Sequence, residues 1–348
     1  MSTTQAGAST QEAQQLDRLY RNALAEGGQL VVYGGGDSPG GLDDMGKAFE
    51  DRFPGVSIHI VTDLSKFHDA RIDNQIARNR LVVDVAHLQT LHDFTYWKRR
   101  GDLLRYVPEI GWRHVPPGLK DQQGYYTGIG VLSLGNVVNA DVAPHGFTPT
   151  TALDFLDTRL KGKMVLAYPS DDDAILFIFK QFVDRHGWEF MDRFMAQEPT
   201  FIRGTEQAGA DVAAGRYAAS PGAWWPLTPS SDGSGTRFMP FTQEPFMTWP
   251  QTAAIFRKAP HPETAKLYLN WLLSEEVQGS SLTPQWPIRS DVQPASGQPS
   301  VYKLNTDPTA FGRFMADRDA VERLKAQFIL YTGEPKGENP TEVHGTNP

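Results

Sequence analysis

The chain has 348 residues, no cysteine and a formal net charge of −8, from 33 lysines and arginines against 41 aspartates and glutamates. The length is sufficient for two hydrophobic cores, because single cores stop growing at roughly 250–300 residues. The missing cysteine excludes disulfides, iron–sulfur clusters, thiolate metal sites and cysteine nucleophiles. No basic run is longer than Lys98-Arg99-Arg100, which argues against a nucleic-acid partner.

Residues 1–15 (MSTTQAGASTQEAQQ) are small and polar. They contain neither the basic n-region nor the apolar h-region of a signal peptide, and we predict that they form a disordered N-terminal segment. No stretch of the chain approaches the roughly 18–20 apolar residues that span a bilayer. Two interpretations fit: an exported protein whose signal was replaced by Met1, or a chain that stays in the cytoplasm.

Residues 16–127 alternate between apolar runs of strand character and amphipathic helical segments. Short connections between them predict a parallel sheet with helices on its faces. The loop Gly34–Gly41 (GGGDSPGG) is neither a P-loop nor a dinucleotide fingerprint, because it lacks both required spacings. The predicted strands are Leu30–Tyr33, Val56–Val61 and Val82–Leu88, and the predicted helices are Leu16–Ala25, a segment that turns Met45, Phe49 and Phe53 inward, and Asp69–Arg80.

The alternation continues beyond residue 128 and then returns. We predict that lobe one consists of 16–127 and 250–335, that lobe two consists of 128–249, and that 336–348 form a polar tail. Two passages between the lobes make a hinge and place a cleft at the carboxyl ends of the strands, where open α/β sheets bind ligands. The later strands expected are Gly128–Leu134, Lys163–Tyr168, Arg216–Ser220 and Trp249–Arg257, and the helices are Pro149–Leu160, Ala174–His186, Trp188–Ala196, Glu206–Ala214, Pro262–Ser274 and Ala310–Tyr331.

Seven segments are scattered in collinear order over about residues 16–335. They are LVVYGGGD (Leu30–Asp37), KAFEDRFPGVSI (Lys47–Ile58), DVAHLQT (Asp84–Thr90), LDTRLKGKMVLAYPSDDDA (Leu156–Ala174), AGRYAAS (Ala214–Ser220), APHPETAKLYLNWLLSEEVQ (Ala259–Gln278) and PIRSDV (Pro287–Val292). In their order and wording these segments resemble the extracellular solute-binding proteins of ABC importers, in the branch that includes ferric-ion, thiamine and phosphonate binders.

This resemblance implies an α/β, two-lobed type II periplasmic-binding fold, in which each lobe is a mainly parallel sheet with helices on both faces. It also implies a monomer that binds a small solute in the interlobe cleft and delivers it to the membrane subunits of an ABC importer. The expected compartment is periplasmic or extracellular after signal removal, and no cofactor is expected.

The candidate ligand-binding residues of lobe one follow the predicted strands. Backbone N–H groups of a glycine-rich loop can face a ligand, and the residues at the strand ends carry hydroxyl, amide and imidazole groups. The alternatives are a flexible turn, a helix cap at Ser65 or Asp69, and a strand-end hydrogen bond. The candidates are Gly36, Asp37, Ser38, Ser65, His68, Gln89 and Thr90.

The candidates of lobe two begin with Asp171, Asp172 and Asp173. A capping box with Ser170 accounts for part of this run, but three carboxylates facing the cleft would favour a cationic solute or a metal ion. Thr205 precedes a helix and either caps it or donates to an anion. Large aromatic side chains are commonly core residues but can stack on a ring or cover a cation, and the aromatic candidates of this lobe are Trp224, Trp225 and Trp249.

Two further observations bear on the ligand. The ferric binders of the resembling family use an adjacent tyrosine pair, and the comparable segment here reads Ala223-Trp224-Trp225-Pro226, which argues against iron. Arg289 and Asp291 are expected to form a structural pair; the alternative, a ligand role for Arg289, would need an acidic solute, so the sign of the ligand's charge stays open. The alternatives to an importer-bound binding protein are a metal-assisted enzyme built on Asp171–Asp173 and His68, and a relative without an importer.

Overall fold

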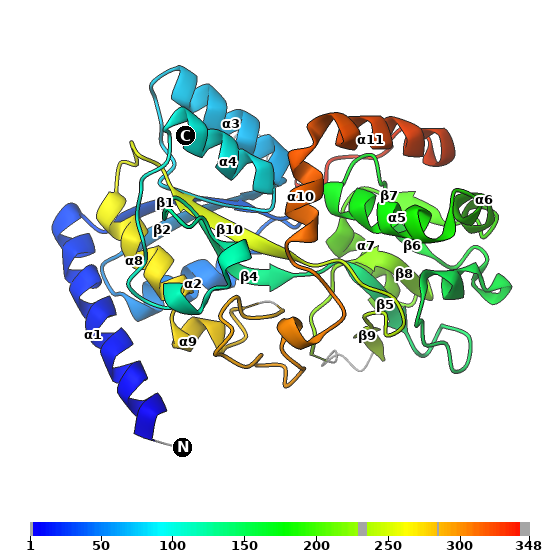
Figure 1. Cartoon of the computed structure of the whole chain (residues 1–348), viewed down its shortest axis with the longest axis horizontal. Coiled ribbons are helices and arrows are strands. Elements are labelled where there is room, and N and C mark those ends of the chain that lie inside the picture. The colour runs from blue at the N-terminus through cyan, green and yellow to red at the C-terminus, as the bar shows by residue number, and fades with distance from the viewer. Residues whose placement is uncertain (1–2, 229–234, 284, 342–348) are drawn as a thin grey trace. The chain divides into compact units, whose positions relative to one another are not determined.

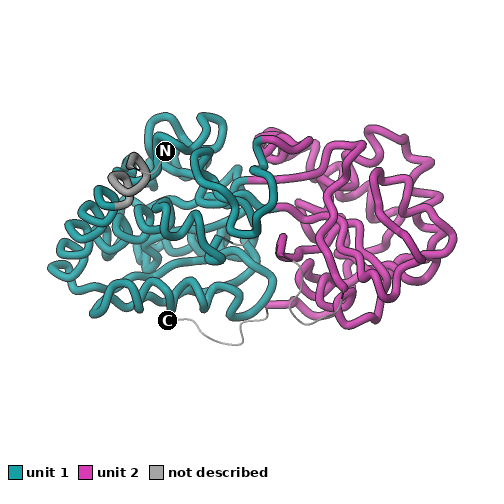
Figure 2. Tube along the Cα trace, turned by 90° about the horizontal axis from the view of Figure 1, so that it is seen from below, with its two compact units in different colours: residues 1–132, 250–302 teal, residues 133–249, 303–348 magenta. Residues whose placement is uncertain are grey.

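The computed structural model describes residues 3–228, 235–283 and 285–341. The chain forms two compact units. Unit 1 consists of Met1–Leu132 and Pro250–Tyr302, and unit 2 consists of Ser133–Trp249 and Lys303–Pro348 (Figure 2). The chain thus passes between the units three times, whereas the sequence predicted two passages.

Unit 1 is built on a five-stranded sheet of order β2-β1-β3-β10-β4 (Figure 1). Its first three strands are parallel, as predicted, with Val32 opposite both Ile60 and Val85. The fourth strand runs antiparallel to β3. The strands are β1 (Gln29–Gly35), β2 (Ser57–Asp63), β3 (Val85–Leu88), β10 (Trp249–Ile255) and β4 (Thr127–Leu132). The last of these lies in unit 1, whereas the sequence prediction began lobe two at residue 128.

The helices of unit 1 pack their apolar faces against this sheet and against one another. Tyr33, Phe94 and Trp97 are almost fully buried in one core cluster. Phe49 packs edge-on against Tyr268 in another part of the unit. The helices are α1 (Thr3–Glu26), α2 (Asp43–Arg52), α3 (Ser65–Ala77), α4 (Leu91–Arg100), α8 (Pro262–Leu272) and α9 (Glu275–Gln278), with 3₁₀ turns at Trp112–His114, Pro117–Leu119 and Val301–Lys303.

The prediction of a disordered segment at residues 1–15 was wrong, because α1 begins at Thr3. Long-range contacts fix this helix. The Glu26 carboxylate accepts hydrogen bonds from the backbone N–H groups of Glu263 and Thr264 at the start of α8. Near the other end, Glu12 accepts from the N–H of Glu275 at 2.8 Å. Carboxylates suit these positions because helix N-termini carry unpaired N–H groups and a positive dipole end.

Unit 2 differs from the predicted mainly parallel sheet. The strands β5 (Gly135–Asn139), β8 (Ala219–Ala223) and β9 (Thr236–Phe238) form a sheet in which β5 pairs antiparallel with both neighbours. The strands β6 (Val165–Ala167) and β7 (Thr200–Ile202) pair in parallel, and a parallel bridge from Met164 to Ala219 links β6 to β8. The helices are α5 (Asp173–His186), α6 (Glu189–Met195), α7 (Thr205–Ala213), α10 (Ala310–Ala316) and α11 (Arg318–Thr332), with 3₁₀ turns at Ala152–Leu156 and Thr158–Leu160.

The terminal helices α10 and α11 lie in unit 2, although the sequence prediction assigned residues 310–331 to lobe one. Aromatic packing explains the difference. The ring of Phe314 lies 5.2 Å from that of Phe177 on α5, and the fully buried Phe328 lies 5.2 Å from the ring of Trp188. Helical periodicity identifies such apolar faces but does not say which of two cores receives them.

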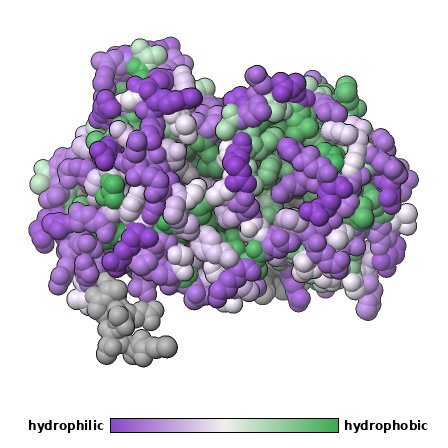
Figure 3. All heavy atoms as spheres, viewed as in Figure 1, coloured by the Kyte–Doolittle hydropathy of each residue, from purple (hydrophilic) through white to green (hydrophobic). Residues whose placement is uncertain are grey.

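Few large hydrophobic side chains of the described residues are exposed. On the face shown in Figure 3, hydrophilic residues predominate and hydrophobic residues form patches between them. Among the described exposed hydrophobic side chains, Leu330 on α11 stands out at 84% exposure. Within the described ranges, no helix has both the length and the apolar character needed to span a bilayer.

Candidate functional site

The carboxyl edge of the unit 1 sheet begins with the end of β1. A Cβ atom at Gly35 would lie 2.2 Å from the hydroxyl of Ser65, so only glycine permits this approach. Ser65 is the first residue of α3, and its hydroxyl accepts a hydrogen bond from the N–H of Gln89 at 3.2 Å. Ser65 therefore joins the ends of β1 and β3 and does not cap its own helix. The half-buried Asp37 and Ser38 follow in the loop after Gly36.

The end of β3 and the start of β10 bring more polar groups to the same edge. Thr90 and Gln251 are 6% and 5% exposed, and Gln251 donates through Nε2 to the carbonyl of His87. At this edge, three buried polar atoms have no hydrogen-bond partner among the described residues: His87 Nδ1, Thr90 Oγ1 and Gln251 Oε1. Sequence reasoning missed His87 and Gln251. Their signal was a polar residue within an otherwise apolar strand.

His68 lies behind this edge and not on it. Its side chain is fully buried, and its ring stacks on Tyr33 with 4.8 Å between ring centroids. Arg71 donates to Nδ1 at 2.9 Å, so the Nε2–H donates to the carbonyl of Gly34 at 3.1 Å. Burial and then the Arg71 charge lower the pKa of His68 to about 4. The residue is therefore neutral at pH 7 and supports the glycine loop from inside the unit.

The three aspartates of unit 2 are each bound by other protein groups. Asp171 forms a two-pronged pair with Arg203, at 2.7 and 3.1 Å. Asp172 is the N-cap of α5 and accepts from the N–H groups of Ala174 and Ile175. Asp173 pairs with Lys325 of α11 at 2.8 Å. The capping role expected within this run thus belongs to Asp172.

These pairs compensate most of the negative charge that the sequence suggested for a cationic solute. Burial alone would lower the pKa of Lys325, but the carboxylate of Asp173 reverses this effect and the pKa is raised. Sequence reasoning did not find Lys325, because it lies on α11, which was assigned to the other lobe. The expectation of a cationic solute therefore loses the observation on which it rested.

The remaining candidates of unit 2 lie after β7 and β8. Thr205 is the first residue of α7 and is 6% exposed, and its carbonyl accepts from the N–H of Trp224. Trp225 packs partly buried against a core cluster of this unit. Trp249 is 2% exposed and lies 6.2 Å from Phe311, which makes it a core residue of unit 2.

The structure thus forms one candidate surface in each unit. In unit 1, the loop after β1, Ser65, Gln89 and Thr90 gather at the carboxyl edge of the sheet. In unit 2, the starts of α5 and α7 adjoin because β6 and β7 pair in parallel, with Ala167 opposite Ile202. Among the residues that the structure describes, no group of three or more His, Asp or Glu side chains is arranged to hold a metal ion.

Comparison with known proteins points to one family. Residues 35–279 match the family model described as bacterial extracellular solute-binding protein. No curated protein sequence matches the chain. Since the structural matches have identities below 25%, they show the fold alone.

Three solved structures illustrate the fold. The substrate binding protein of the ABC transporter from Agrobacterium tumefaciens is 15% identical with a TM-score of 0.72, covering 88% of this chain and 96% of its own. The periplasmic binding protein AfuA from Actinobacillus pleuropneumoniae, with fructose-6-phosphate bound, is 18% identical with a TM-score of 0.68, covering 87% and 98%. Iron-bound HitA from Pseudomonas aeruginosa is 19% identical with a TM-score of 0.68, covering 86% and 99%. The α/β fold and the family resemblance predicted from the sequence are confirmed.

Proposed function

Because the chain belongs to the family of bacterial extracellular solute-binding proteins, we propose that it binds a small solute at the carboxyl edge of the unit 1 sheet and delivers it to an ABC importer. The buried polar atoms without partners carry this assignment. A buried group that lacks a hydrogen bond costs about 1–3 kcal/mol, and such groups in a native protein require an explanation. A solute that bonds to Thr90 Oγ1 and Gln251 Oε1 recovers that cost.

The charges of both surfaces favour a polar solute without a large net charge. In unit 1, Asp63 pairs with Arg71 at 2.9 Å, and His68 is neutral. In unit 2, Arg203 and Lys325 neutralise Asp171 and Asp173. Hydroxyl and amide groups match the unpaired acceptors and donors of unit 1. We therefore place polyols, sugars and amides ahead of iron and polyamines.

The solved relatives have different ligands bound. One relative has bound fructose-6-phosphate and another has bound iron. An iron site in this chain lacks the tyrosine pair, since tryptophans occupy positions 224 and 225. The importer partner, a monomeric state and an extracytoplasmic location follow from the family and belong to the same proposal.

A metal-assisted enzyme is the weaker alternative. It was built on His68 and Asp171–Asp173, but both ring nitrogens of His68 are hydrogen-bonded inside unit 1. Asp173 is paired with Lys325. Neither residue is left to hold a metal ion or move a proton, so we propose binding without turnover.

The first test is a thermal-shift and calorimetric panel of sugars, sugar phosphates, polyols, amino acids, thiamine, polyamines and ferric ion on ligand-stripped protein. A solute at about 100 times its dissociation constant adds about 2.7 kcal/mol of stability, or roughly 5–11 °C for units of this size. We expect a polar hit. A ferric or polyamine hit alone would overturn the charge argument, and conversion of the hit to a product would overturn the assignment as a binder.

Substitutions at the carboxyl edge of the unit 1 sheet then test whether the solute found in the panel binds there. Thr90→Ala and Gln251→Ala each remove one unpaired group, and we expect a loss of affinity of about five- to thirtyfold. Gln298→Ala, at an exposed position of the same unit, is the matched control and leaves affinity unchanged. If all three variants bind as the wild type does, the solute does not contact this edge. Solute uptake by cells lacking the gene, restored by the wild type and not by Gln251→Ala, tests delivery.

A further inference from the structure

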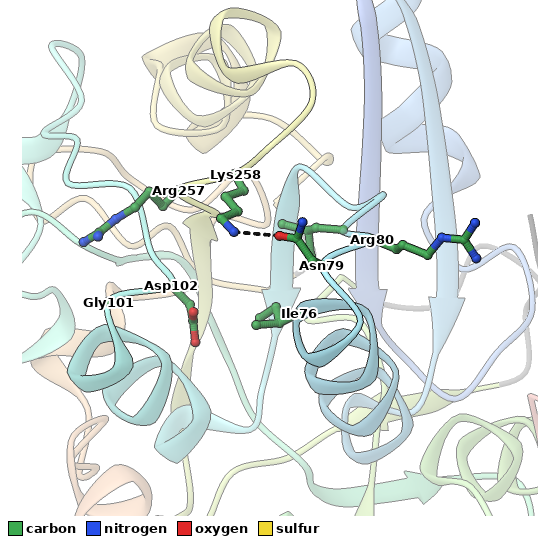
Figure 4. A pocket seen from close by; sticks show the side chains of 8 residues that line it. Ile76, Asn79, Arg80, Gly101, Asp102, Arg257 and Lys258 are labelled. Atoms are coloured by element: carbon green, nitrogen blue, oxygen red, sulfur yellow. Dashed lines mark hydrogen bonds between the residues drawn. The ribbon is translucent and has the colours of Figure 1, made fainter.

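A pocket of about 320 Å³ lies in unit 1, between the loops that follow α3, α4 and β10 (Figure 4). The strand β10 is antiparallel to β3, with Ile255 opposite Val85, so the end of β10 lies beside the amino end of β3. The candidate solute residues stand at the carboxyl end of β3. The pocket is therefore a separate place, at the other edge of the same sheet.

The pocket has an apolar floor. Ile76, near the end of α3, and Leu81, just before β3, line it and pack partly buried against the core cluster around Trp97. One wall is formed at Gly101, which ends α4 in a left-handed conformation with φ of +79°. A Cβ atom there would lie 3.4 Å from the guanidinium of Arg257, so this arginine lies close over the glycine.

The mouth of the pocket is basic. The ammonium of Lys258 donates to Oδ1 of Asn79 at 2.7 Å, and Figure 4 shows this bond crossing above Ile76. The carboxylate of Asp102 also lines the pocket and is paired at 2.8 Å with Nε of Arg100, which it shares with Asp73. Asn79 is neutral, so this hydrogen bond brings no opposing charge to the ammonium of Lys258.

Two arginines add to this charge. Arg80 and Arg257 line the pocket, and their side chains extend away from it in opposite directions (Figure 4). Neither has a carboxylate within ion-pair distance in the described part of the chain. This local excess of positive charge is notable in a protein with a net charge of −8, since it attracts anions to this edge.

We propose that the pocket binds a small organic anion, a monocarboxylate with a short apolar chain. The carboxylate meets the ammonium of Lys258 at the mouth, and the apolar chain lies on Ile76 and Leu81. The volume is at the lower end of small-molecule pockets, about 300–1,000 Å³, and two apolar side chains line the pocket beside five polar or charged ones. An inorganic anion would leave the apolar floor unused, so the pocket selects for an organic one.

The test titrates hexanoate, acetate and 1-hexanol into the full chain by calorimetry, at low salt and at about 0.3 M salt. We expect hexanoate to bind at least about tenfold more tightly than acetate, which lacks the apolar chain, and than 1-hexanol, which lacks the carboxylate. Hexanoate should also bind less tightly at high salt. Lys258→Gln should weaken hexanoate binding about tenfold. Ile76→Phe, which fills the floor, should abolish it. The control Lys161→Gln changes an exposed lysine of unit 2 and should have no effect.

Four outcomes overturn the proposal: no hexanoate binding up to about 20 mM, equal binding of hexanol, tighter binding of the zwitterion norleucine, or equal affinities for Lys258→Gln and Lys161→Gln. Thr90→Ala and Gln251→Ala should leave hexanoate binding unchanged. That comparison separates this pocket from the solute-binding edge, so either proposal can fail without the other.

Discussion

Replacing Arg289 with methionine should destabilise unit 1 strongly. Arg289 is 3% exposed and lies at the centre of a network that joins α1 to the body of the unit. It donates to Glu12 at 2.7 Å, to the two oxygens of Asp291 at 3.0 and 2.8 Å, and to the carbonyl of Leu273 at 3.0 Å. Methionine keeps the aliphatic volume and removes all four bonds.

The size of this destabilisation depends on the carboxylates that lose their partner when Arg289 is replaced. Removing one partner of a buried ion pair costs about 3–5 kcal/mol, because the other charge stays buried. Glu12 has a side chain 14% exposed, but that of Asp291 is 34% exposed, so water compensates part of its loss. We therefore expect about 3 kcal/mol. At 2–4 °C per kcal/mol, the melting temperature of unit 1 falls by about 6–12 °C.

Calorimetry of Arg289→Met and Arg313→Met measures this effect. Arg313 pairs with Asp307, but the two side chains are 65% and 52% exposed, so its loss should change the free energy of unfolding by about 0.5 kcal/mol or less. A fall of less than about 2 °C in Arg289→Met, or a fall equal to that of the control, refutes the reasoning. A double-mutant cycle with Glu12→Gln then isolates the coupling to α1.

The pH dependence gives an independent check. Burial raises the pKa of Asp291, but the hydrogen bonds and charge of Arg289 outweigh it, and the pKa lies below the ordinary value of 3.8. As the pH falls, Asp291 is therefore protonated at a higher pH in the unfolded chain than in the folded chain. The stability contributed by the pair is present above about pH 4 and is lost as the pH falls below it. This loss should be absent from Arg289→Met.

Three further predictions concern single positions. Gly111→Ala should cost more than about 2 kcal/mol by urea unfolding, because φ is +68° and the new Cβ would lie 2.3 Å from a backbone oxygen; an unchanged midpoint contradicts this. Phe328→Ala should lower the stability of unit 2 by about 3–5 kcal/mol, whereas Leu330→Ala, 84% exposed on the same helix, should change it by about 0.5 kcal/mol or less. Burial lowers the pKa of His68 and His87 from 6.5 to about 4. Between these values the unfolded state binds more protons, so the free energy of unfolding should fall as the pH drops from 6.5 to about 4. A free energy of unfolding that does not change over this pH range, or a pH dependence that is the same in His68→Gln, argues against this prediction.

The sequence predicted best where the signal was local. The strand–helix alternation of residues 30–88 gave β1, β2 and β3 within a few residues, because hydrophobic periodicity and glycine turns are short-range features. It failed where distant residues decide. Residues 1–15 were predicted to be disordered because the contacts that hold this segment are long-range. The partners of Glu12 are Glu275 and Arg289, more than 260 positions away.

The candidate site shows the same division. Topology alone brings the predicted strand-end residues Ser65, Gln89 and Thr90 to one edge of the sheet, and their role in ligand binding stays a prediction. The sequence did not show that the negative charge of Asp171 and Asp173 is compensated, because their partners come from distant segments. Arg203 lies in the loop after β7, and Lys325 lies on α11. Residue type and spacing give the chemistry that a segment offers, but only tertiary contacts show which groups are already bound.

The three passages between the units have a consequence for how the chain matures. Unit 1 lacks β10 and α8 until residue 272 has been made, and unit 2 lacks the aromatic faces of α10 and α11 until residue 332. Neither core is complete in a fragment that ends before residue 272, and the partners of Glu12 and Glu26 on α1 come from residues 263–289 of its own unit. We therefore expect folding to be completed largely after synthesis, and a truncated product to expose two unfinished cores to proteolysis.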